Sequence, residues 1–258
     1  MKKTKIVATI SDKRCEVDFI KKLYNAGMNV VRLNTAHIGL DEFKKVVDNV
    51  RQVNDKIAIM VDTKGPEIRT TKAIEQIYLK KGDIVKIKGN ADRYTTKEFV
   101  YVTYSRFVEE VQIGSKILID DGMIELEVKE KEEDYLVCIA NNDGELESRK
   151  SVNVPSINFQ LPALTEKDIN FIKSCIEYDV DFIAHSFVRN KKDIMVIKEI
   201  LEQYNSRIKI IAKIENQEGV DNLDEILDVA DGAMVARGDL AIEIPYEKIP
   251  GIQKMIIN

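Results

Sequence analysis

Charged and amide side chains stand at the ends of several apolar runs in this sequence, at the points where buried strands would finish. These side chains are Arg32, Asn34, Asp62, Lys213 and Glu215. Arginine and lysine bind phosphate and carboxylate groups, and carboxylates bind divalent cations. Because an unpaired charge in a buried strand is costly, this grouping predicts a site that binds an anion together with a metal ion.

A pair of carboxylates is the strongest candidate for the metal ligands. Lys213 and Glu215 are two residues apart and therefore project from the same face of one strand. Asp239 follows the next apolar run, and Gly238 before it lets a ligand approach the backbone closely. Two carboxylates about 4 Å apart repel by roughly 4 kcal/mol at an effective dielectric of 20, and a divalent cation removes that repulsion. We expect Glu215 and Asp239 to bind Mg²⁺; the alternative is a ligand-free network of ion pairs, Lys213 with Glu215 and Arg237 with Asp239.

Cations and further oxygen donors accompany this pair. Arg32, Arg69 and Lys213 together suit a phosphorylated or polycarboxylate substrate. Asn34 and Asp62 lie on neighbouring predicted strands, and they either bind a monovalent cation or hydrogen-bond each other. The spacing leaves both possibilities open.

The sequence lacks the residues that a catalytic triad, a zinc site or a glycine-rich phosphate loop would need. The only histidines are His37 and His185, and neither has a cysteine, serine or second histidine placed for a triad or a zinc site. His185 lies inside an apolar run and is expected to be structural. Glycine-rich phosphate loops of the Gly-x-Gly-x-x-Gly and Gly-x-x-x-x-Gly-Lys types are absent, so a nucleotide would be bound in another way.

The composition describes a soluble protein. Hydrophobic residues make up 44% and charged residues 32% of the 258 residues, and the net charge is −5. This balance gives no basis for nucleic-acid binding or a polybasic membrane anchor, and no apolar run reaches the roughly 18 residues of a membrane span. Three scattered cysteines without a Cys-x-x-Cys motif predict reduced thiols. We therefore expect a cytoplasmic protein.

Apolar runs rich in β-branched residues alternate with amphipathic stretches. The expected strands are Lys5–Ile10, Val30–Thr35, Ile57–Thr63, Phe182–Val188, Lys209–Glu215 and Ala233–Leu240. The expected helices are Val17–Ala26, Asp41–Val53, Thr165–Tyr178, Lys191–Tyr204 and Val220–Val229. This order predicts a parallel sheet buried on both faces, either doubly wound or a (β/α) barrel. In a parallel barrel, ligands bind at the C-terminal ends of the strands, which is where the charged residues stand.

Residues 70–153 break this rhythm. Turn signals there separate short alternating strands at Ile84–Lys88, Phe99–Val102, Lys116–Ile119, Ile124–Val128 and Leu136–Ala140, which predicts a small all-β domain. The charged run Glu127–Asp134 is expected to be a solvated hairpin. The barrel domain would comprise 1–69 and 154–258. Without the insertion the chain has room for about six of eight barrel units, so we expect it to be a fragment of a longer protein.

Five motifs, in this order, carry a resemblance to a known family. They are Thr4–Ile10 (TKIVATI), Val31–His37 (VRLNTAH), Asp62–Thr70 (DTKGPEIRT), Ile211–Gly219 (IAKIENQEG) and Met234–Leu240 (MVARGDL). Over essentially its whole length the chain resembles the pyruvate kinases. The resemblance implies a TIM-type barrel with a small β lid inserted after the third strand. It also implies phosphoryl transfer from phosphoenolpyruvate to ADP, giving pyruvate and ATP, with Mg²⁺ (or Mn²⁺) and usually K⁺, in a homotetrameric parent enzyme.

The same resemblance implies a role for each matching residue. Arg32 and Lys213 would contact the phosphate and stabilise the transferring phosphoryl group, and Gly238 and Asp239 would also bind substrate. The Mg²⁺ ligands would be Glu215 and Asp239; the K⁺ ligands Asn34, Asp62 and the Thr63 carbonyl; and the nucleotide-binding residues Arg69, Lys150, Asn34 and His37. The lid would carry Asp120-Asp121-Gly122 and close over the nucleotide to exclude water.

Two features depart from the family pattern. Ala36 stands where the family commonly has a serine that helps to ligate K⁺, although Glu67 matches the K⁺-dependent members. The sequence also stops before a threonine-bearing loop linked to protonation of the enolpyruvate and before the C-terminal allosteric domain. We therefore expect little turnover from this chain alone. The alternatives are a Mg²⁺-dependent aldolase or lyase of a pyruvate-like enolate and an inactive barrel fragment; the lid and Lys150 favour the kinase, because a lyase has no nucleotide to cover.

Overall fold

A computed structural model of the chain describes residues 4–36, 38–155 and 157–258. Contacts between residues divide the chain into two units. The parallel-sheet unit comprises Met1–Pro66 and Pro162–Ala236, and the antiparallel-sheet unit comprises Glu67–Leu161 and Arg237–Asn258.

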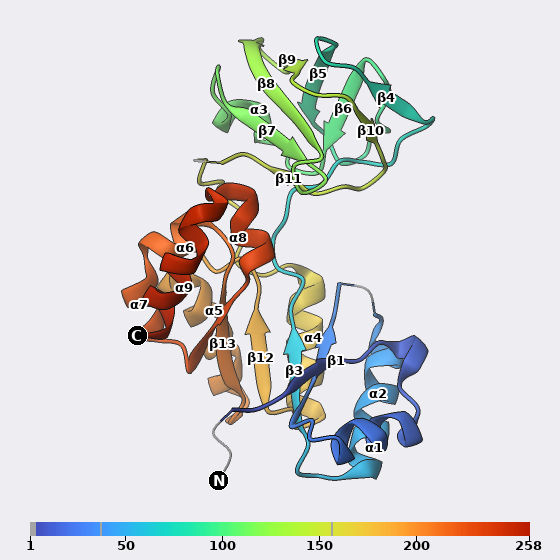
Figure 1. The fold of residues 1–258 in the computed structure, drawn as a ribbon, viewed down its shortest axis with the longest axis vertical. Helices are drawn as coiled ribbons and strands as arrows, with labels where there is room; N and C mark the ends of the chain where they lie inside the picture. The colour runs from blue at the N-terminus through green and yellow to red at the C-terminus, as the bar shows by residue number, and fades with distance from the viewer. Residues whose placement is uncertain (1–3, 37, 156) are drawn as a thin grey trace. The chain divides into compact units, whose positions relative to one another are not determined.

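Six parallel strands form the sheet of the first unit (Figure 1). In spatial order they are β1 (Val7–Thr9), β2 (Val30–Asn34), β3 (Ala58–Asp62), β12 (Phe182–His185), β13 (Lys209–Ile214) and β14 (Gly232–Val235). Each strand is the neighbour of the next parallel strand along the chain, without the reversal of order that defines a doubly wound sheet. This sequential order identifies the sheet as part of a (β/α) barrel and confirms the predicted fold class.

Helices follow the strands much as the hydrophobic pattern predicts. They are α1 (Val17–Asn25), α2 (Leu40–Val53), α4 (Glu166–Glu177), α5 (Lys191–Gln203), α6 (Gln217–Asp221) and α7 (Leu223–Leu227). The short 3₁₀ helix η1 (Asp12–Arg14) precedes α1, and α1 packs against α2 (Figure 1). Gly27 ends α1 with a φ of +106°, and the Thr165–Asp168 capping box begins α4.

The prediction of a single helix over 220–229 was wrong, because the two shorter helices α6 and α7 occupy this part of the chain. Asn216 caps α6 by accepting the N–H of Gly219 at 2.7 Å. Asn222 separates α6 from α7 and donates its side-chain amide to the carbonyl of Arg189 at 2.9 Å. That tertiary hydrogen bond, which the local pattern does not contain, accompanies the break.

Both faces of the central strands are buried, as a parallel sheet requires. Val31 and Ile59 are fully buried, and helices supply fully or nearly fully buried rings from Phe43 and Phe171, which pack edge to face at 5.8 Å. This core holds the C-terminal ends of the strands in fixed positions, and the polar side chains there lie on a rigid frame.

The antiparallel-sheet unit is built on a second six-stranded sheet. Its order is β11 (Val152–Asn153), β7 (Lys116–Ile119), β8 (Ile124–Lys131), β9 (Leu136–Ala140), β5 (Ile84–Gly89) and β6 (Phe99–Val102). All five predicted strands are present, and β8 extends into the charged hairpin. Backbone hydrogen bonds from residues 68–71 to both β6 and the segment around β11 join the two edges, so the sheet closes on a buried core.

Most of the remaining elements of this unit escaped the sequence analysis, namely β4 (Ile77–Leu79), β10 (Gly144–Leu146), α3 (Phe107–Glu110), α8 (Arg237–Glu243) and η2 (Tyr246–Lys248). The last helix, α9 (Ile249–Ile257), lies where the sequence pattern predicts a helix at the end of the chain. The strands and α3 are only three or four residues long, too short to show a period. None of the helices in the three described ranges is long and apolar enough to cross a membrane.

Candidate active site

Lys213 is the centre of a buried polar cluster at the C-terminal ends of the parallel strands. Its side chain, 10% exposed, forms ion pairs with Asp62 Oδ1 at 3.1 Å and Glu215 Oε1 at 2.8 Å. Its third hydrogen bond goes to Ser186 Oγ at 2.7 Å. Burial lowers the pKa of Lys213, but the facing carboxylates of Glu215 and Asp62 outweigh burial and hold this pKa above its usual range. The ammonium group therefore stays charged at neutral pH.

Asp62 links this ammonium to a second cation. Arg32, on the adjacent strand β2, donates Nε to Asp62 Oδ2 at 2.8 Å and also pairs with that oxygen through Nη2. Arg32 donates in addition to Thr9 Oγ1 at 3.2 Å. The Asp62 side chain is only 2% exposed, so one buried carboxylate is shared between two cations. With Glu215, the cluster holds two positive and two negative charges.

Thr63 and His185 support this cluster from inside the sheet. Thr63 Oγ1 accepts the N–H of Ser186 at 3.1 Å and lies 3.1 Å from His185 Nδ1. Burial lowers the pKa of His185 to about 4. His185 is therefore a neutral partner of the threonine at pH 7, in line with the structural role expected for it.

Backbone geometry also positions Glu215. The N–H of Phe187 donates to Glu215 Oε2 at 2.6 Å. Phe187 adopts a left-handed φ of +56°, a strained conformation for a bulky side chain. The turn around Gly65, with φ +68°, lies against this segment, and a Cβ at Gly65 would stand 2.9 Å from the Ser186 carbonyl oxygen.

The oxygens predicted to bind a monovalent cation are near one another but are already engaged. Asn34 and Asp62 are partners in the register of β2 and β3. Asn34 Oδ1 accepts the N–H of Ala36 at 3.0 Å, and the Thr63 carbonyl accepts the Ser186 hydroxyl at 2.7 Å. Among the described residues Asn34 and Asp62 do not hydrogen-bond each other, so that alternative is not realised. The donor types suit an alkali cation, except that Ala36 offers no hydroxyl.

Asp239 does not end a strand, and this prediction was wrong. Strand β14 stops at Val235, and Asp239 lies in the first turn of α8. The positive end of the helix dipole stabilises a negative charge at that position. Gly238 and Asp239 are exposed. Within the described part of the chain the alternative ion pair of Arg237 with Asp239 is not formed, whereas that of Lys213 with Glu215 is.

The chemistry of the predicted Mg²⁺ ligands suits the ion, because Mg²⁺ prefers carboxylate oxygens together with water and substrate oxygens. The residues described contain no group of three or more His, Cys, Asp or Glu side chains arranged to hold a metal. Two protein carboxylates are nevertheless enough for Mg²⁺ when a phosphate supplies further oxygens. Glu215 belongs to the parallel-sheet unit and Asp239 to the other unit, and their joint role stays a prediction.

The predicted nucleotide-binding cations lie in the antiparallel-sheet unit. Arg69 pairs with Glu67, with Nη2 at 3.1 Å from Oε2, and donates to the carbonyl of Arg149 at 2.7 Å. Lys150 pairs with Glu147 at 2.8 Å and with Asp120 at 3.1 Å, and these hydrogen bonds raise the pKa of Lys150. Arg69 is thus paired within its own unit, while the structure joins Arg32 and Lys213 through Asp62.

The turn Asp120-Asp121-Gly122 stands beside Lys150. Its three residues have φ values of +54°, +53° and +87°. Ser151 donates to Asp121 Oδ1 at 2.7 Å and holds this strained turn in place. His37, also predicted to bind the nucleotide, lies outside the described residues.

Sequence reasoning missed Ser186 and Phe187. The apolar run 182–188 predicts a continuous strand, whereas β12 ends at His185. A serine inside such a run was the available signal, because a buried hydroxyl needs a partner. The left-handed backbone of Phe187 has no local sequence signature.

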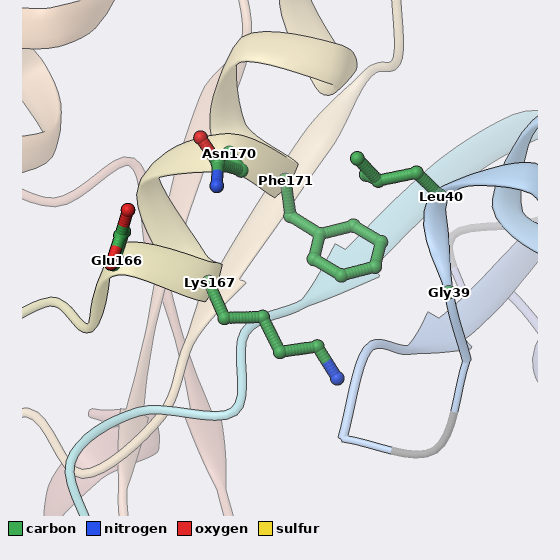
Figure 2. A pocket seen from close by; sticks show the side chains of 6 residues that line it. All are labelled: Gly39, Leu40, Glu166, Lys167, Asn170 and Phe171. Carbon is green, nitrogen blue, oxygen red and sulfur yellow. The ribbon is translucent and has the colours of Figure 1, made fainter.

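A pocket in the parallel-sheet unit lies apart from these residues. It has a volume of about 330 Å³ and is lined by Gly39, Leu40, Glu166, Lys167, Asn170 and Phe171. Figure 2 shows Leu40 and Phe171 pointing toward each other across it. Lys167 lies 5.5 Å from the centroid of the Phe171 ring. This pocket is largely apolar, and none of the predicted site residues lines it.

The sequential parallel strands, with a buried polar cluster at their C-terminal ends, define an α/β-barrel protein. The family described as "Pyruvate kinase, barrel domain" matches residues 1–258, and the chain belongs to this family. It is 50% identical over 256 residues to a pyruvate kinase of Borreliella burgdorferi, covering 99% of this chain and 53% of that protein. It is 48% identical over 265 residues to a pyruvate kinase of Staphylococcus aureus strain MRSA252, covering 100% of this chain and 45% of that protein. The chain spans about half the length of the curated relatives it matches.

Proposed function

We propose that this chain carries the phosphoryl-transfer site of a pyruvate kinase, which converts phosphoenolpyruvate and ADP into pyruvate and ATP. The observation that supports this most is the buried cluster of Lys213, Arg32, Asp62 and Glu215 at the C-terminal ends of the parallel strands. Family membership supports the same activity. The barrel domain would comprise 1–69 and 154–258, and the lid 70–153.

Arg32 and Lys213 would act on the phosphoryl group. Transfer of a phosphoryl group passes through a loose transition state that needs positioning and compensation of charge more than covalent help. The Lys213 ammonium is buried and stays charged, so it would place a fixed positive charge close to the negative charge that develops on the phosphoryl group. Arg32 would contact the substrate phosphate next to Lys213, because Asp62 pairs with both Arg32 and Lys213 and holds them close together.

Metal ions would complete this site. Glu215 and Asp239 would hold Mg²⁺ (or Mn²⁺), which supplies charge neutralisation at the phosphoryl oxygens when bound. Asn34, Asp62 and the Thr63 carbonyl would hold K⁺. The protein charges of the inner cluster cancel, with Arg32 and Lys213 opposing Asp62 and Glu215, so a highly anionic substrate is better accommodated together with added cations.

The antiparallel-sheet unit would bind the nucleotide. The substrate would also contact α8, which belongs to the same unit. Arg69 and Lys150 present cations for the ADP phosphates, held by Glu67 and Asp120 respectively. The Gly238 backbone would lie against the substrate carboxylate. Residues Asn34 and His37 would complete the nucleotide site. The parent enzyme would be a cytoplasmic homotetramer.

An assay of ADP-dependent pyruvate formation tests this function. The 258-residue chain and a version extended at its C-terminus are assayed with phosphoenolpyruvate and Mg²⁺, with and without K⁺. Glu215→Gln is the test variant, and Glu218→Gln, three residues further on, is its control. We expect loss of Mg²⁺-dependent rate only in Glu215→Gln. Cleavage of a hydroxy-keto acid without ATP formation by the extended protein would overturn the proposal.

A further inference from the structure

Ser186 is a buried member of the cluster around Lys213. It directly follows β12 and is 2% exposed. Its hydroxyl oxygen lies 2.7 Å from Lys213 Nζ, 2.7 Å from the Thr63 carbonyl oxygen and 3.1 Å from Asp62 Oδ1. One hydroxyl at the end of β12 therefore contacts groups from two other strands, β3 with the residue that follows it, and β13.

The direction of each hydrogen bond follows from the groups involved. A lysine ammonium has three donors and no acceptor, so Lys213 donates to Ser186 Oγ. The single hydroxyl proton of Ser186 is then directed at the Thr63 carbonyl, its nearer acceptor. The chain of donation runs from Lys213 through Ser186 to Thr63.

The acceptors around Lys213 match its donors in number. Asp62 Oδ1, Glu215 Oε1 and Ser186 Oγ accept one hydrogen bond each. An ammonium group held by two acceptors can still rotate and shift, because its third N–H is not directed. Three acceptors fix both its position and its rotation. Loss of the serine oxygen would leave one buried donor without a partner, which is costly.

The backbone of Ser186 is itself held in place. Its N–H donates to Thr63 Oγ1 at 3.1 Å, and the turn at Gly65 fits closely against its carbonyl because Gly65 has no side chain. The next residue, Phe187, has a strained backbone whose N–H reaches Glu215. Two consecutive residues thus hold the lysine and the glutamate of the site.

We propose that Ser186 is a positioning residue, whose hydroxyl holds the Lys213 ammonium between Asp62 and Glu215 in the orientation that phosphoryl transfer requires. The reaction named here rests on the proposed function, whereas the placement of the ammonium does not depend on any reaction. Ser186 acts through Lys213. A displacement of about 1 Å in a positioned group can lower a rate about 100-fold.

Crystal structures and kinetics of three variants of the whole chain test this proposal. Ser186→Ala removes the oxygen, Ser186→Cys keeps the volume with a weak acceptor, and Ser186→Thr keeps the hydroxyl. Asn49→Ala is the control, because it removes a partly buried hydrogen bond to the carbonyl of Cys15 in the same unit. Two variants that remove the oxygen guard against one of them failing to fold.

We expect the Lys213 ammonium to be displaced by about 1 Å or to be disordered in Ser186→Ala and Ser186→Cys, and unchanged in Ser186→Thr and Asn49→Ala. We expect kcat to fall about 10- to 100-fold in the first two, with the KM for phosphoenolpyruvate within about 3-fold, and to return to near normal in Ser186→Thr. An ammonium that stays in place in both Ser186→Ala and Ser186→Cys would overturn the proposal, as would an unchanged kcat. Absence of transfer in the unaltered chain and its extended version would count against the proposed function alone, since the crystal structures still decide the role of Ser186.

Discussion

The two groups of cations in this chain are held in different ways. Lys213 lies in a buried cluster whose partners come from β3 and from the residues that directly follow β12 and β13, and its side chain is 10% exposed. Lys150 pairs with Asp120 and Glu147 near the surface of the antiparallel-sheet unit, and its side chain is 28% exposed. Exposed ion pairs contribute little to stability, whereas breaking a buried one leaves an uncompensated charge. The comparison teaches that buried partners fix the first cation firmly, while the partners of the second lie near the surface and cost little to exchange.

The largest effect is expected from loss of the buried ammonium. Lys213→Met leaves Asp62 and Glu215 without their shared cation, so the free energy of unfolding should fall by about 3–5 kcal/mol. Phosphoryl transfer should fall by about 10²–10³-fold. Lys209→Met is the matched control, because Lys209 begins the same strand, its side chain is 61% exposed and it pairs with Asp231. The control should lose less than about 1 kcal/mol.

Urea unfolding and initial rates measure both variants. Similar losses of unfolding free energy and of rate in Lys213→Met and Lys209→Met would contradict the difference between a buried and an exposed lysine on β13.

The second effect concerns pH. The pKa of His185 is lowered to about 4 in the folded chain, from 6.5 when exposed. Below pH 6.5 the unfolded chain therefore binds a proton that the folded chain excludes, and stability is lost as the pH falls toward 4. The loss should reach about 3 kcal/mol. Lys150 has a raised pKa and titrates far above this range, so it should contribute nothing here.

Urea unfolding at pH 7, 5.5 and 4.5 checks this prediction, with His185→Gln beside the unaltered chain. The variant should show a flatter dependence of stability on pH, because glutamine does not titrate. Parallel curves for the two proteins would contradict the buried neutral histidine.

The third effect separates strain from close contact. Gly65→Ala places a Cβ 2.9 Å from the Ser186 carbonyl oxygen, and Gly82→Ala, at φ +94°, meets nothing within 4 Å. Both lose the left-handed freedom of glycine, so Gly82→Ala should cost about 1 kcal/mol. Gly65→Ala should cost about 1–3 kcal/mol more. Thermal unfolding of both variants measures the difference, and equal losses would remove the argument for close approach at Gly65.

The smallest effect is expected in the antiparallel-sheet unit. Asp120→Asn removes one of the two ion pairs of Lys150, and Glu147→Gln removes the other. Each should change stability by less than about 1 kcal/mol, because both pairs lie near the surface and are partly exposed. The KM for ADP should change by about 2- to 5-fold with kcat nearly constant, since a single exposed pair is worth only a fraction of a kcal/mol to about one. Steady-state kinetics with ADP varied tests this, and a large loss of kcat would show that Lys150 is fixed as firmly as Lys213.

Much of the fold could be predicted from the sequence, because buried parallel strands read as continuous apolar runs. The prediction of a strand from an apolar run was wrong over the second half of 233–240, where α8 begins at Arg237. Apolar content does not distinguish a strand from the turn and helix that follow it. Short strands such as β4 and β10 carry too few residues for a period.

The site could be predicted only in part. Arg32, Asp62, Lys213 and Glu215 were found because charged residues at strand ends demand partners. Ser186 and Phe187 were not found, because their roles depend on a tertiary arrangement that places them against β3 and β13. The exact partners of each charge depend likewise on register, which the residue pattern does not fix.

The most direct measurement of the central claim follows a labelled phosphoryl group. The chain at high concentration is mixed with ³²P-phosphoenolpyruvate, ADP and Mg²⁺, and labelled ATP is quantified beside Lys213→Met and Lys209→Met. The account predicts labelled ATP, even if slowly formed, from the unaltered chain and from Lys209→Met, and essentially none from Lys213→Met. Equal labelling by Lys213→Met would contradict it.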